Sequence, residues 1–248
     1  MVAIRSKSEL EKIRQASKLT ARTLAFLKNK VVPGITTAEL DNMAAKFISA
    51  LGGRAASLGY HGYPAHICTS INEQVVHGIP GARMLRKGDI VSIDIVVEYQ
   101  GYFGDSAITI GVGKISKQAA NLIFTTKQAL RKGIQSAKSG NRVSDISYAV
   151  EQYVKKAGFS VVRDFTGHGI GAMMHEEPQI PNYGKPGRGV KLKPGMVLAI
   201  EPMVNIGTWQ VEILEDHWTV VTKDNGLSAH FEHTICITDK DAEVFTLN

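Results

Sequence analysis

The sequence predicts an α+β protein in which one unit, two helices followed by an antiparallel sheet, occurs twice. Residues 34–52 align without a gap with residues 140–158, and both stretches begin and end in glycine. Further along, LRKGDIVSID (85–94) aligns without a gap with LKPGMVLAIE (192–201). Repeated patterns of this kind indicate an internal duplication, and we expect the two halves to pack about a pseudo-twofold axis.

Helix boundaries follow from capping and stop residues. The first helix is expected to begin at Ser8, where Glu11 completes a capping box, and the second at Thr36, where Glu39 has the same spacing. Segments that contain glycine or proline end both helices. The four helices are expected at about residues 8–31, 36–51, 116–137 and 144–157.

A hairpin between the two helical pairs carries two aspartates. Strand-forming residues 90–97 and 102–110 flank the polar segment 98–101, which is typical of a four-residue hairpin loop. With the loop centred on its middle two residues, Asp94 lies opposite Asp105 on one face. Two carboxylates this close on apolar strands repel each other, so the sequence predicts a cation between them or a proton on one.

Length and composition favour one domain over residues 1–248, made of halves at about 8–113 and 114–248. The chain is 44% hydrophobic and 21% charged, which allows a large core. The two cysteines form no disulfide framework, which favours a reducing compartment such as the cytoplasm. Charges begin within the first few residues, so we expect neither a signal peptide nor a membrane span. The net charge of +6 suits an approach to RNA, although a generally basic protein without such a role is the more common case.

Five side chains are candidates for a metal site. The duplication makes Glu201 the counterpart of Asp94, and Glu232 has the place of Asp105 on a return strand. His168 lies in TGHGIG, a glycine-rich loop that lets the imidazole reach inward. Four carboxylates and one imidazole suit two divalent ions of the Mn, Fe(II) and Co class, whereas a cysteine-rich structural zinc site is excluded. Each residue alone also has an ordinary alternative, such as a pairing of Glu232 with a neighbouring histidine.

The motifs around these residues resemble the type I methionine aminopeptidases of the bacterial or organellar kind. They extend over residues 58–234 and read LGYHGYP, SINEQVVHGIP, GDIVSIDI, GYFGDSA, GHGIG, HEEPQIPNYG, AIEPM and FEHT. The resemblance implies the pita-bread fold, itself a pseudo-twofold duplication. It also implies metal-dependent removal of the N-terminal methionine from nascent chains with a small second residue, by a monomer in the cytoplasm that contacts the ribosome surface.

The resemblance further implies a role for individual residues. Asp105 and Glu232 are implied to bridge two metal ions. The full set that matches the metal ligands is Asp94, Asp105, His168, Glu201 and Glu232. The residues that match catalytic groups are His77 near the substrate amide, His175 near the scissile carbonyl and Glu201 as the proton carrier. The residues that match the wall of the methionine pocket are Tyr60, Tyr63, Cys68 and Trp218.

Three departures and two other functions bear on this interpretation. Ser57, Ala172 and Met174 differ from many relatives, which concerns inhibitor preference and substrate fit and not the reaction. X-Pro aminopeptidases and prolidases share the fold, but they usually carry an extra N-terminal domain for which this chain has no room. A pita-bread protein without catalysis, which binds RNA or ribosomes, is the other alternative; such proteins usually lose ligands, and all five are present here.

Overall fold

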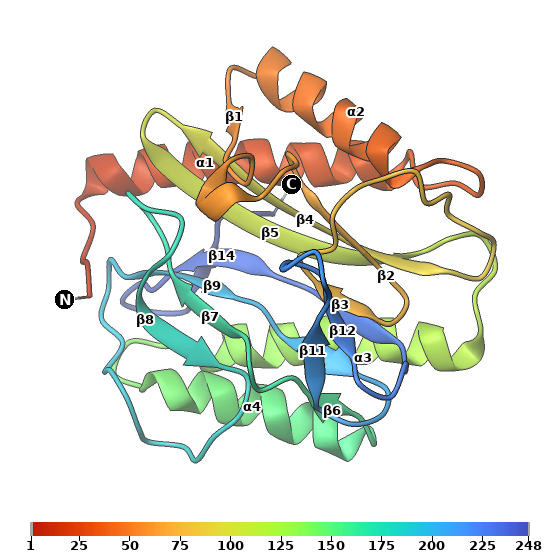
Figure 1. Cartoon of the computed structure of the whole chain (residues 1–248). Coiled ribbons are helices and arrows are strands. Elements are labelled where there is room, and N and C mark those ends of the chain that lie inside the picture. Colours follow the sequence, from red (N-terminus) through yellow and green to blue (C-terminus); the bar gives the residue numbers. More distant parts are fainter. Residues whose placement is uncertain (1, 248) are drawn as a thin grey trace.

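The protein, described over residues 2–247 by a computed structural model, has two pairs of helices with antiparallel sheets between them (Figure 1). The α+β class and all four expected helices are confirmed. The helices are α1 (Lys7–Lys28), α2 (Thr37–Ala50), α3 (Lys117–Ser136) and α4 (Val143–Lys156), with a short 3₁₀ helix, η1, at Tyr60–Gly62.

The strands form four sheets within the described residues, and their pairings are antiparallel. One sheet has the order β1-β4-β2 with β5 on the other edge of β4, and a second has the order β15-β14-β9-β7-β8. Two smaller sheets have the orders β13-β10-β6 and β11-β12-β3. The strands are β1 (Arg54–Ala55), β2 (Cys68–Ile71), β3 (Gln74–Val76), β4 (Ile90–Tyr99), β5 (Tyr102–Gly111), β6 (Ser160–Val161), β7 (Thr166–Gly169), β8 (Glu176–Pro181), β9 (Val197–Ile200), β10 (Met203–Asn205), β11 (Val211–Ile213), β12 (Val220–Thr222), β13 (Ser228–His230), β14 (His233–Cys236) and β15 (Glu243–Val244).

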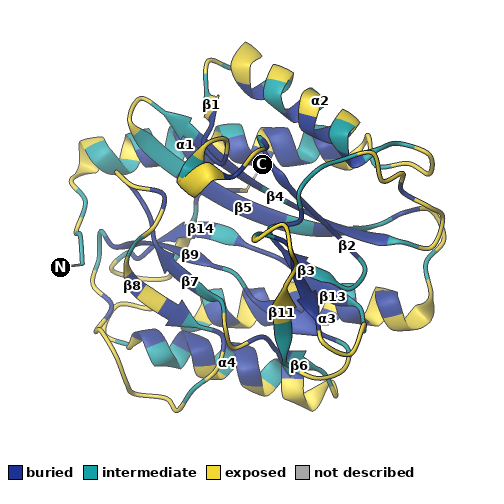
Figure 2. Ribbon diagram, in the orientation of Figure 1, coloured by how far each residue is buried: buried dark blue, intermediate teal, exposed yellow. Residues whose placement is uncertain are grey.

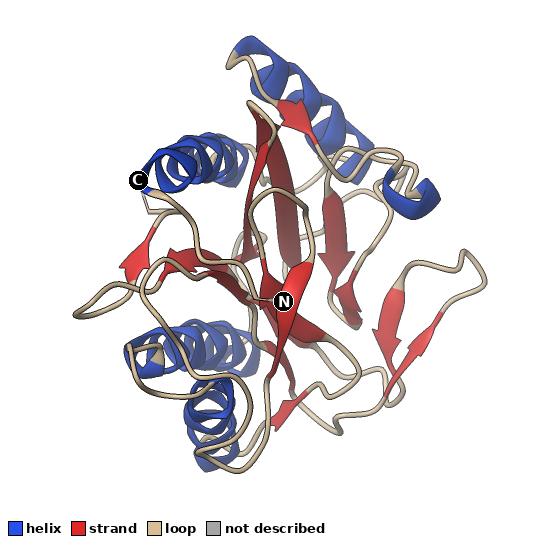
Figure 3. Cartoon of the chain, turned by 90° about the vertical axis from the view of Figure 1, so that its left-hand side faces the viewer, coloured by secondary structure: helices blue, strands red, loops and turns tan. Residues whose placement is uncertain are grey.

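The helices lie at the periphery and the strands in the middle, as the side view in Figure 3 shows. Helix α1 contacts β4 and β5, whereas α3 contacts β9, β10 and β13, and α4 contacts β6 and β8. Figure 2 shows buried strands in the centre and exposed residues on the outward faces of the helices. One face of the central strands is therefore covered by helices, and side chains on the opposite face are free to meet across the two halves.

The backbone geometry repeats between the halves. Gly34 and Gly140 both have a φ of 94°, a left-handed conformation that favours glycine. The Gly34 amide donates to Leu85 O at 2.8 Å, and the Gly140 amide donates to Leu192 O at 3.0 Å. The aligned glycines therefore mark the same turn in each half. Isolated bridges also occur at matching places, Thr36 with Met84 and Arg142 with Lys191.

Helix α1 begins two residues earlier than the sequence predicts. Ser6, and not Ser8, is the N-cap: Ser6 Oγ accepts from Glu9 N at 3.3 Å, and Glu9 Oε2 accepts from Ser6 N at 2.9 Å. The segment SKSELE contains the capping-box spacing twice. The earlier one is used because Arg5 fixes the chain in front of it, with its amide donating to Gly195 O at 2.9 Å.

Candidate functional site

Asp94 and Asp105 lie on one face of the β4–β5 hairpin, but not directly opposite each other. The loop contains only residues 100–101, both with positive φ (52° and 79°), rather than four residues. Asp94 therefore pairs with Ala107, and Asp105 pairs with Val96. The predicted pairing is wrong by two positions. A shift of two residues keeps both carboxylates on the same face of the sheet, so they are diagonal neighbours.

Hydrogen bonds between β5 and the segment around β14 join the two halves at Asp105 and Glu232. Asp105 N donates to Thr234 Oγ1 at 3.0 Å, and Thr234 Oγ1 donates to Asp105 O at 2.7 Å. Glu232 N donates to Ala107 O at 2.9 Å, and Ser106 Oγ donates to Glu232 O at 2.6 Å. Two carboxylates that come from different halves are thus fixed next to each other by their own backbones.

His168 lies on the central strand β7 rather than in a loop, which corrects the sequence-based expectation. A Cβ on Gly167 would lie 2.4 Å from Ala199 O, and one on Gly169 would lie 2.3 Å from Glu177 O. The glycines of the GHGIG motif therefore allow β8 and β9 to approach β7 closely from both sides. The imidazole between them is held in the sheet and not on a flexible segment.

The imidazole of His168 points the unprotonated nitrogen of its ring toward the carboxylates. Its Nδ1 donates to the carbonyl oxygen of Gly169 at 2.9 Å, so Nε2 of the neutral ring carries no proton. Nε2 lies 3.4 Å from Glu201 Oε1 and 3.8 Å from Asp105 Oδ2. One ligand atom each from Asp105, His168 and Glu232 lies within 4.8 Å of the others. Acceptors face acceptors here, so the cluster requires either protons or a cation.

Burial raises the pKa of all four carboxyl groups above the ordinary values. Repulsion between the carboxylates raises the pKa of Asp105, Glu201 and Glu232 further. Burial raises the pKa of Asp94 to about 7, and a hydrogen bond with Asp105 acts in the opposite direction. Burial also lowers the pKa of His168 to about 3, so its imidazole stays neutral and offers no charge to balance the carboxylates.

The donor set fits a divalent metal. Asp105 Oδ1 and Glu232 Oε1 are buried and have no hydrogen-bond partner among the described residues. Buried acceptors without a donor are rare and costly in native proteins, and a bound cation would satisfy both. The alternative pairing of Glu232 with a nearby histidine does not occur: His230 Nε2 lies 3.9 Å from Glu201 Oε2, and His233 Nδ1 bonds Thr246 Oγ1 at 2.8 Å.

The cluster lines a cavity of about 320 Å³. All eleven residues that the sequence singled out line this cavity: Tyr60, Tyr63, Cys68, His77, Asp94, Asp105, His168, His175, Glu201, Trp218 and Glu232. Four further residues line it: Ser57 and Met174, which the sequence links to substrate fit, and His61 and Val96, which were not singled out. Ser57 and Met174, two of the departures, thus face the cavity, whereas Ala172 lines a neighbouring hollow.

Aromatic and sulfur-containing side chains form one wall of the cavity beside the carboxylates. Tyr63 is buried, its hydroxyl donates to Gly78 O at 3.0 Å, and its ring meets Trp218 edge-on with 5.1 Å between centroids. Cys68 is buried on β2, directly opposite Asp94 on β4. A mostly apolar side chain bound against this wall would therefore lie next to the metal-binding groups.

His77 enters the cavity from a strained position at the end of β3. Its φ is 59°, uncommon for a residue other than glycine, and its ring packs edge-on against Phe165 at 5.5 Å between centroids. Burial lowers the pKa of His77 to about 4, which keeps the ring neutral. Phe165 was missed by the sequence analysis because its contact with His77 joins segments with no shared motif.

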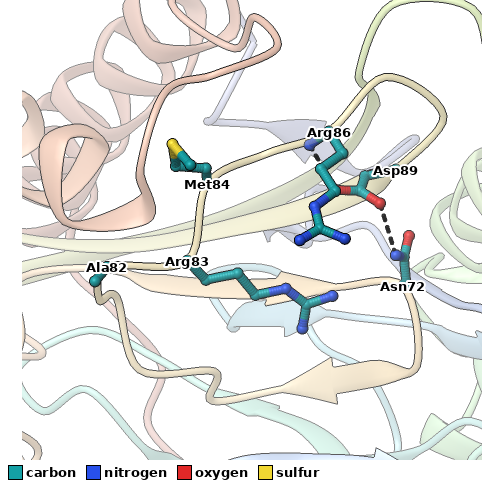
Figure 4. A pocket seen from close by; sticks show the side chains of 6 residues that line it. All are labelled: Asn72, Ala82, Arg83, Met84, Arg86 and Asp89. Carbon is teal, nitrogen blue, oxygen red and sulfur yellow. Dashed lines mark hydrogen bonds between the residues drawn. The ribbon is translucent and has the colours of Figure 1, made fainter.

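A second cavity, of about 570 Å³, lies where the chain passes from β3 to β4 (Figure 4). Its carboxylate is already engaged: Asp89 accepts from Asn72 Nδ2 at 2.9 Å and from Arg86 N at 2.8 Å. Arg83 reaches Glu73 at 3.5 Å. None of the described residues that line it has a buried polar side-chain atom without a hydrogen-bond partner, in contrast to Asp105 and Glu232, so the carboxylate–histidine cavity is the candidate site. The lining residues are Asn72, Ala82, Arg83, Met84, Arg86 and Asp89.

Comparison with known proteins gives the family. Residues 11–239 match the family described as metallopeptidase family M24. The chain belongs to this family. A curated methionine aminopeptidase of Clostridium acetobutylicum is 50% identical over 248 residues, which cover 100% of this chain and 99% of that protein. The resemblance to methionine aminopeptidases is confirmed, and this M24 member is a metallo-aminopeptidase and a hydrolase.

Solved structures agree with this assignment and with the pita-bread fold. The crystal structure of methionine aminopeptidase from Thermotoga maritima matches with a TM-score of 0.99 and 44% identity, and each chain covers 100% of the other. A prolidase from Pyrococcus furiosus matches with a TM-score of 0.81 at 21% identity, and this chain covers 65% of it, which shows a shared fold alone. Among the described residues, we find no helix with the length and apolar character needed to span a membrane.

Proposed function

We propose that this M24 peptidase removes the N-terminal methionine from peptides and nascent proteins whose second residue is small. The observation that carries the proposal is that the carboxylate–histidine cluster and the aromatic wall line the same cavity. Metallopeptidase membership and the cluster support a divalent metal. The full-length similarity to methionine aminopeptidases supports methionine as the residue that is removed.

Two divalent ions of the Co, Mn and Fe(II) class fit the donor set best, because it is rich in oxygen and contains one imidazole. Asp105 and Glu232, which come from different halves and lie next to each other, would be shared between the ions. Such ions, when bound, lower the pKa of a water molecule and polarise a carbonyl group. The residues proposed to hold them are Asp94, Asp105, His168, Glu201 and Glu232.

The chain's own residues bind the substrate and move protons around it. The methionine side chain lies against Tyr63 and Trp218, where each sulfur–aromatic contact contributes about 0.3–1.5 kcal/mol. The Glu201 carboxylate takes a proton from the attacking water and delivers it to the leaving amine. His175 stabilises the developing negative charge on the carbonyl oxygen, and neutral His77 contacts the amide nitrogen of the scissile bond. The remaining proposed pocket residues are Tyr60 and Cys68.

Peptide hydrolysis tests the proposal against its two alternatives. With added Mn²⁺, the protein is expected to release methionine from Met-Ala-Ser and to leave the dipeptide Phe-Pro intact. Cleavage of Phe-Pro without cleavage of Met-Ala-Ser would instead indicate a prolidase, which shares the fold. Binding to ribosomes without metal-dependent hydrolysis would indicate a binding protein that has lost catalysis.

His77→Ala is expected to lower kcat for Met-Ala-Ser roughly 100-fold while the protein retains its metal content. His77 assists the proton transfer from Glu201 at the leaving amine, and groups that take part in such a transfer contribute about 100- to 10,000-fold. The metal content is retained because His77 lies outside the carboxylate cluster, and its ring packs against Phe165. Steady-state kinetics and metal analysis of the same preparation check both parts. An unchanged kcat would remove His77 from the mechanism.

We also propose the domain organisation, the oligomeric state and the cellular location of the enzyme. We infer a single catalytic domain whose halves, about residues 8–113 and 114–248, contribute ligands to one site. We also infer that the enzyme acts as a monomer on nascent chains in the cytoplasm. The formal charge of +6 is compatible with an approach to the anionic RNA of the ribosome surface. Sedimentation of the purified protein with and without ribosomes tests the last two points.

A further inference from the structure

His175 is anchored through its neighbour in sequence. Glu176 forms a partly buried ion pair with Arg5, from the segment before α1. Glu176 Oε1 also accepts from Ala172 N at 2.8 Å and from Met173 N at 3.0 Å. These bonds fix the backbone on both sides of His175, at the start of β8. They leave the rotation and the protonation of its ring to be set by another group.

The Tyr60 hydroxyl is the group that hydrogen-bonds the ring of His175, and the ring of His168 packs edge-on against it with 4.4 Å between centroids. The Tyr60 Oη–His175 Nδ1 distance is 2.6 Å, and the ring centroids are 5.2 Å apart. Left-handed backbone at Gly59 (φ 81°) and His61 (φ 46°) flanks Tyr60 on both sides. The Tyr60 ring packs against a cluster that includes Met174. The tight turn of LGYHGYP therefore aims the phenol at His175, and Tyr60 is more than a wall of the methionine pocket.

We propose that the Tyr60 hydroxyl is a positioning group that donates its proton to His175 Nδ1 and so holds the ring in the tautomer with its proton on Nε2. A neutral imidazole has one donor nitrogen and one acceptor nitrogen. With Nδ1 engaged as the acceptor, Nε2–H remains as the donor available inside the cavity. A donor is what a carbonyl oxygen with developing negative charge requires, so this inference rests on the role proposed above for His175.

The opposite tautomer would present the wrong group to the cavity. If Nδ1–H donated to the phenol oxygen, the Tyr60 proton would pass to solvent water, because the pair is exposed. The cavity would then receive the lone pair of Nε2, which repels a carbonyl oxygen. Partial burial raises the pKa of Tyr60, so the phenol keeps its proton.

Nitrogen NMR tests the tautomer without any turnover. In ¹⁵N-histidine-labelled protein, metal-free or loaded with diamagnetic Zn²⁺, the His175 signals are assigned with a His175→Gln variant. We expect an unprotonated Nδ1 and a protonated Nε2 in the wild type, and a mixture of both tautomers in Tyr60→Phe. Tyr63→Phe is the matched control, because its hydroxyl donates to Gly78 O instead and its loss leaves the tautomer unchanged. A protonated Nδ1 in the wild type would overturn the proposal.

Kinetics test whether Tyr60 acts through His175. Tyr60→Phe is expected to lower kcat for Met-Ala-Ser about 10-fold, the lower end of the effect of removing a group that orients a site histidine, with KM nearly constant. In a His175→Ala background the same change should have almost no further effect on kcat. Tyr148→Phe, which removes a hydroxyl from an exposed side chain on α4, should behave as wild type.

Two outcomes would contradict the coupling. One is an equal loss of kcat from Tyr60→Phe in the wild-type and His175→Ala backgrounds. The other is an increase in KM alone, which would make Tyr60 a pocket wall only. If the wild type fails to cleave Met-Ala-Ser while the NMR shows the expected tautomer, the proposed function fails and the hydrogen bond between Tyr60 and His175 stands. The two ideas are therefore tested separately.

Discussion

Asp105→Ala is expected to abolish the hydrolysis of Met-Ala-Ser, with a loss of at least about 1,000-fold, and to lower the amount of metal bound. Asp105 is buried, and its Oδ1 has no hydrogen-bond partner among the described residues. One oxygen of Asp105 and one ligand atom each of His168 and Glu232 lie within 4.8 Å of one another. Removal of a proposed ligand weakens the binding of the divalent metal and with it the activation of water. Assays with and without added Mn²⁺, together with metal analysis, measure the two effects.

The matched control is Asp239→Ala, which removes an exposed carboxylate that lies between β14 and β15 and does not line the cavity. This variant should retain wild-type activity and metal content. Circular dichroism should show that Asp105→Ala remains folded, since the backbone bonds between Asp105 and Thr234 do not depend on its side chain. Full activity in a metal-free Asp105→Ala protein would disprove the assigned role of this residue.

The duplication in the sequence predicted which carboxylates meet, but not how the first hairpin is paired. Period-two alternation places Asp94 and Asp105 on one face whichever loop of even length connects the strands. The loop itself was ambiguous, because Gln100 is an unusual residue at positive φ and the two-residue turn was not recognised. The face of the sheet on which the two aspartates lie was therefore predictable, whereas the register between β4 and β5 was not.

The contacts that position His175 could not be predicted from any pattern. Its bond to Tyr60 and the ion pair between Glu176 and Arg5 join segments that are 115 and 171 residues apart. Neither pair is related by the internal repeat, and neither lies on a common helix or strand. The chemistry of the site was visible in the residue types, whereas the hydrogen bonds that orient it required the three-dimensional arrangement.

Metal-free Asp94→Asn is expected to be more stable than the metal-free wild type at pH 8, and the difference should vanish below about pH 4. Burial raises the pKa of Asp94 from 3.8 to about 7. Between these values the folded protein binds more protons than the unfolded chain, so the stability of the metal-free wild type falls as the pH rises through this window. This pKa shift corresponds to a difference of no more than about 4 kcal/mol in the free energy of unfolding at pH 8.

Denaturant unfolding at several pH values measures this difference, and Asp224→Asn provides a control of opposite sign. Hydrogen bonds from the amides of Thr208 and Gly226 lower the pKa of Asp224, so this carboxylate stabilises the fold above its unfolded pKa. Asp224→Asn should therefore destabilise the protein at pH 8 and have no effect in acid. Added Mn²⁺ should stabilise the wild type and reverse the order relative to Asp94→Asn, because the cation replaces repulsion among the carboxylates by attraction. A gap between the metal-free proteins that stays constant from pH 4 to 8 would show that Asp94 is not held in an electrostatically strained site.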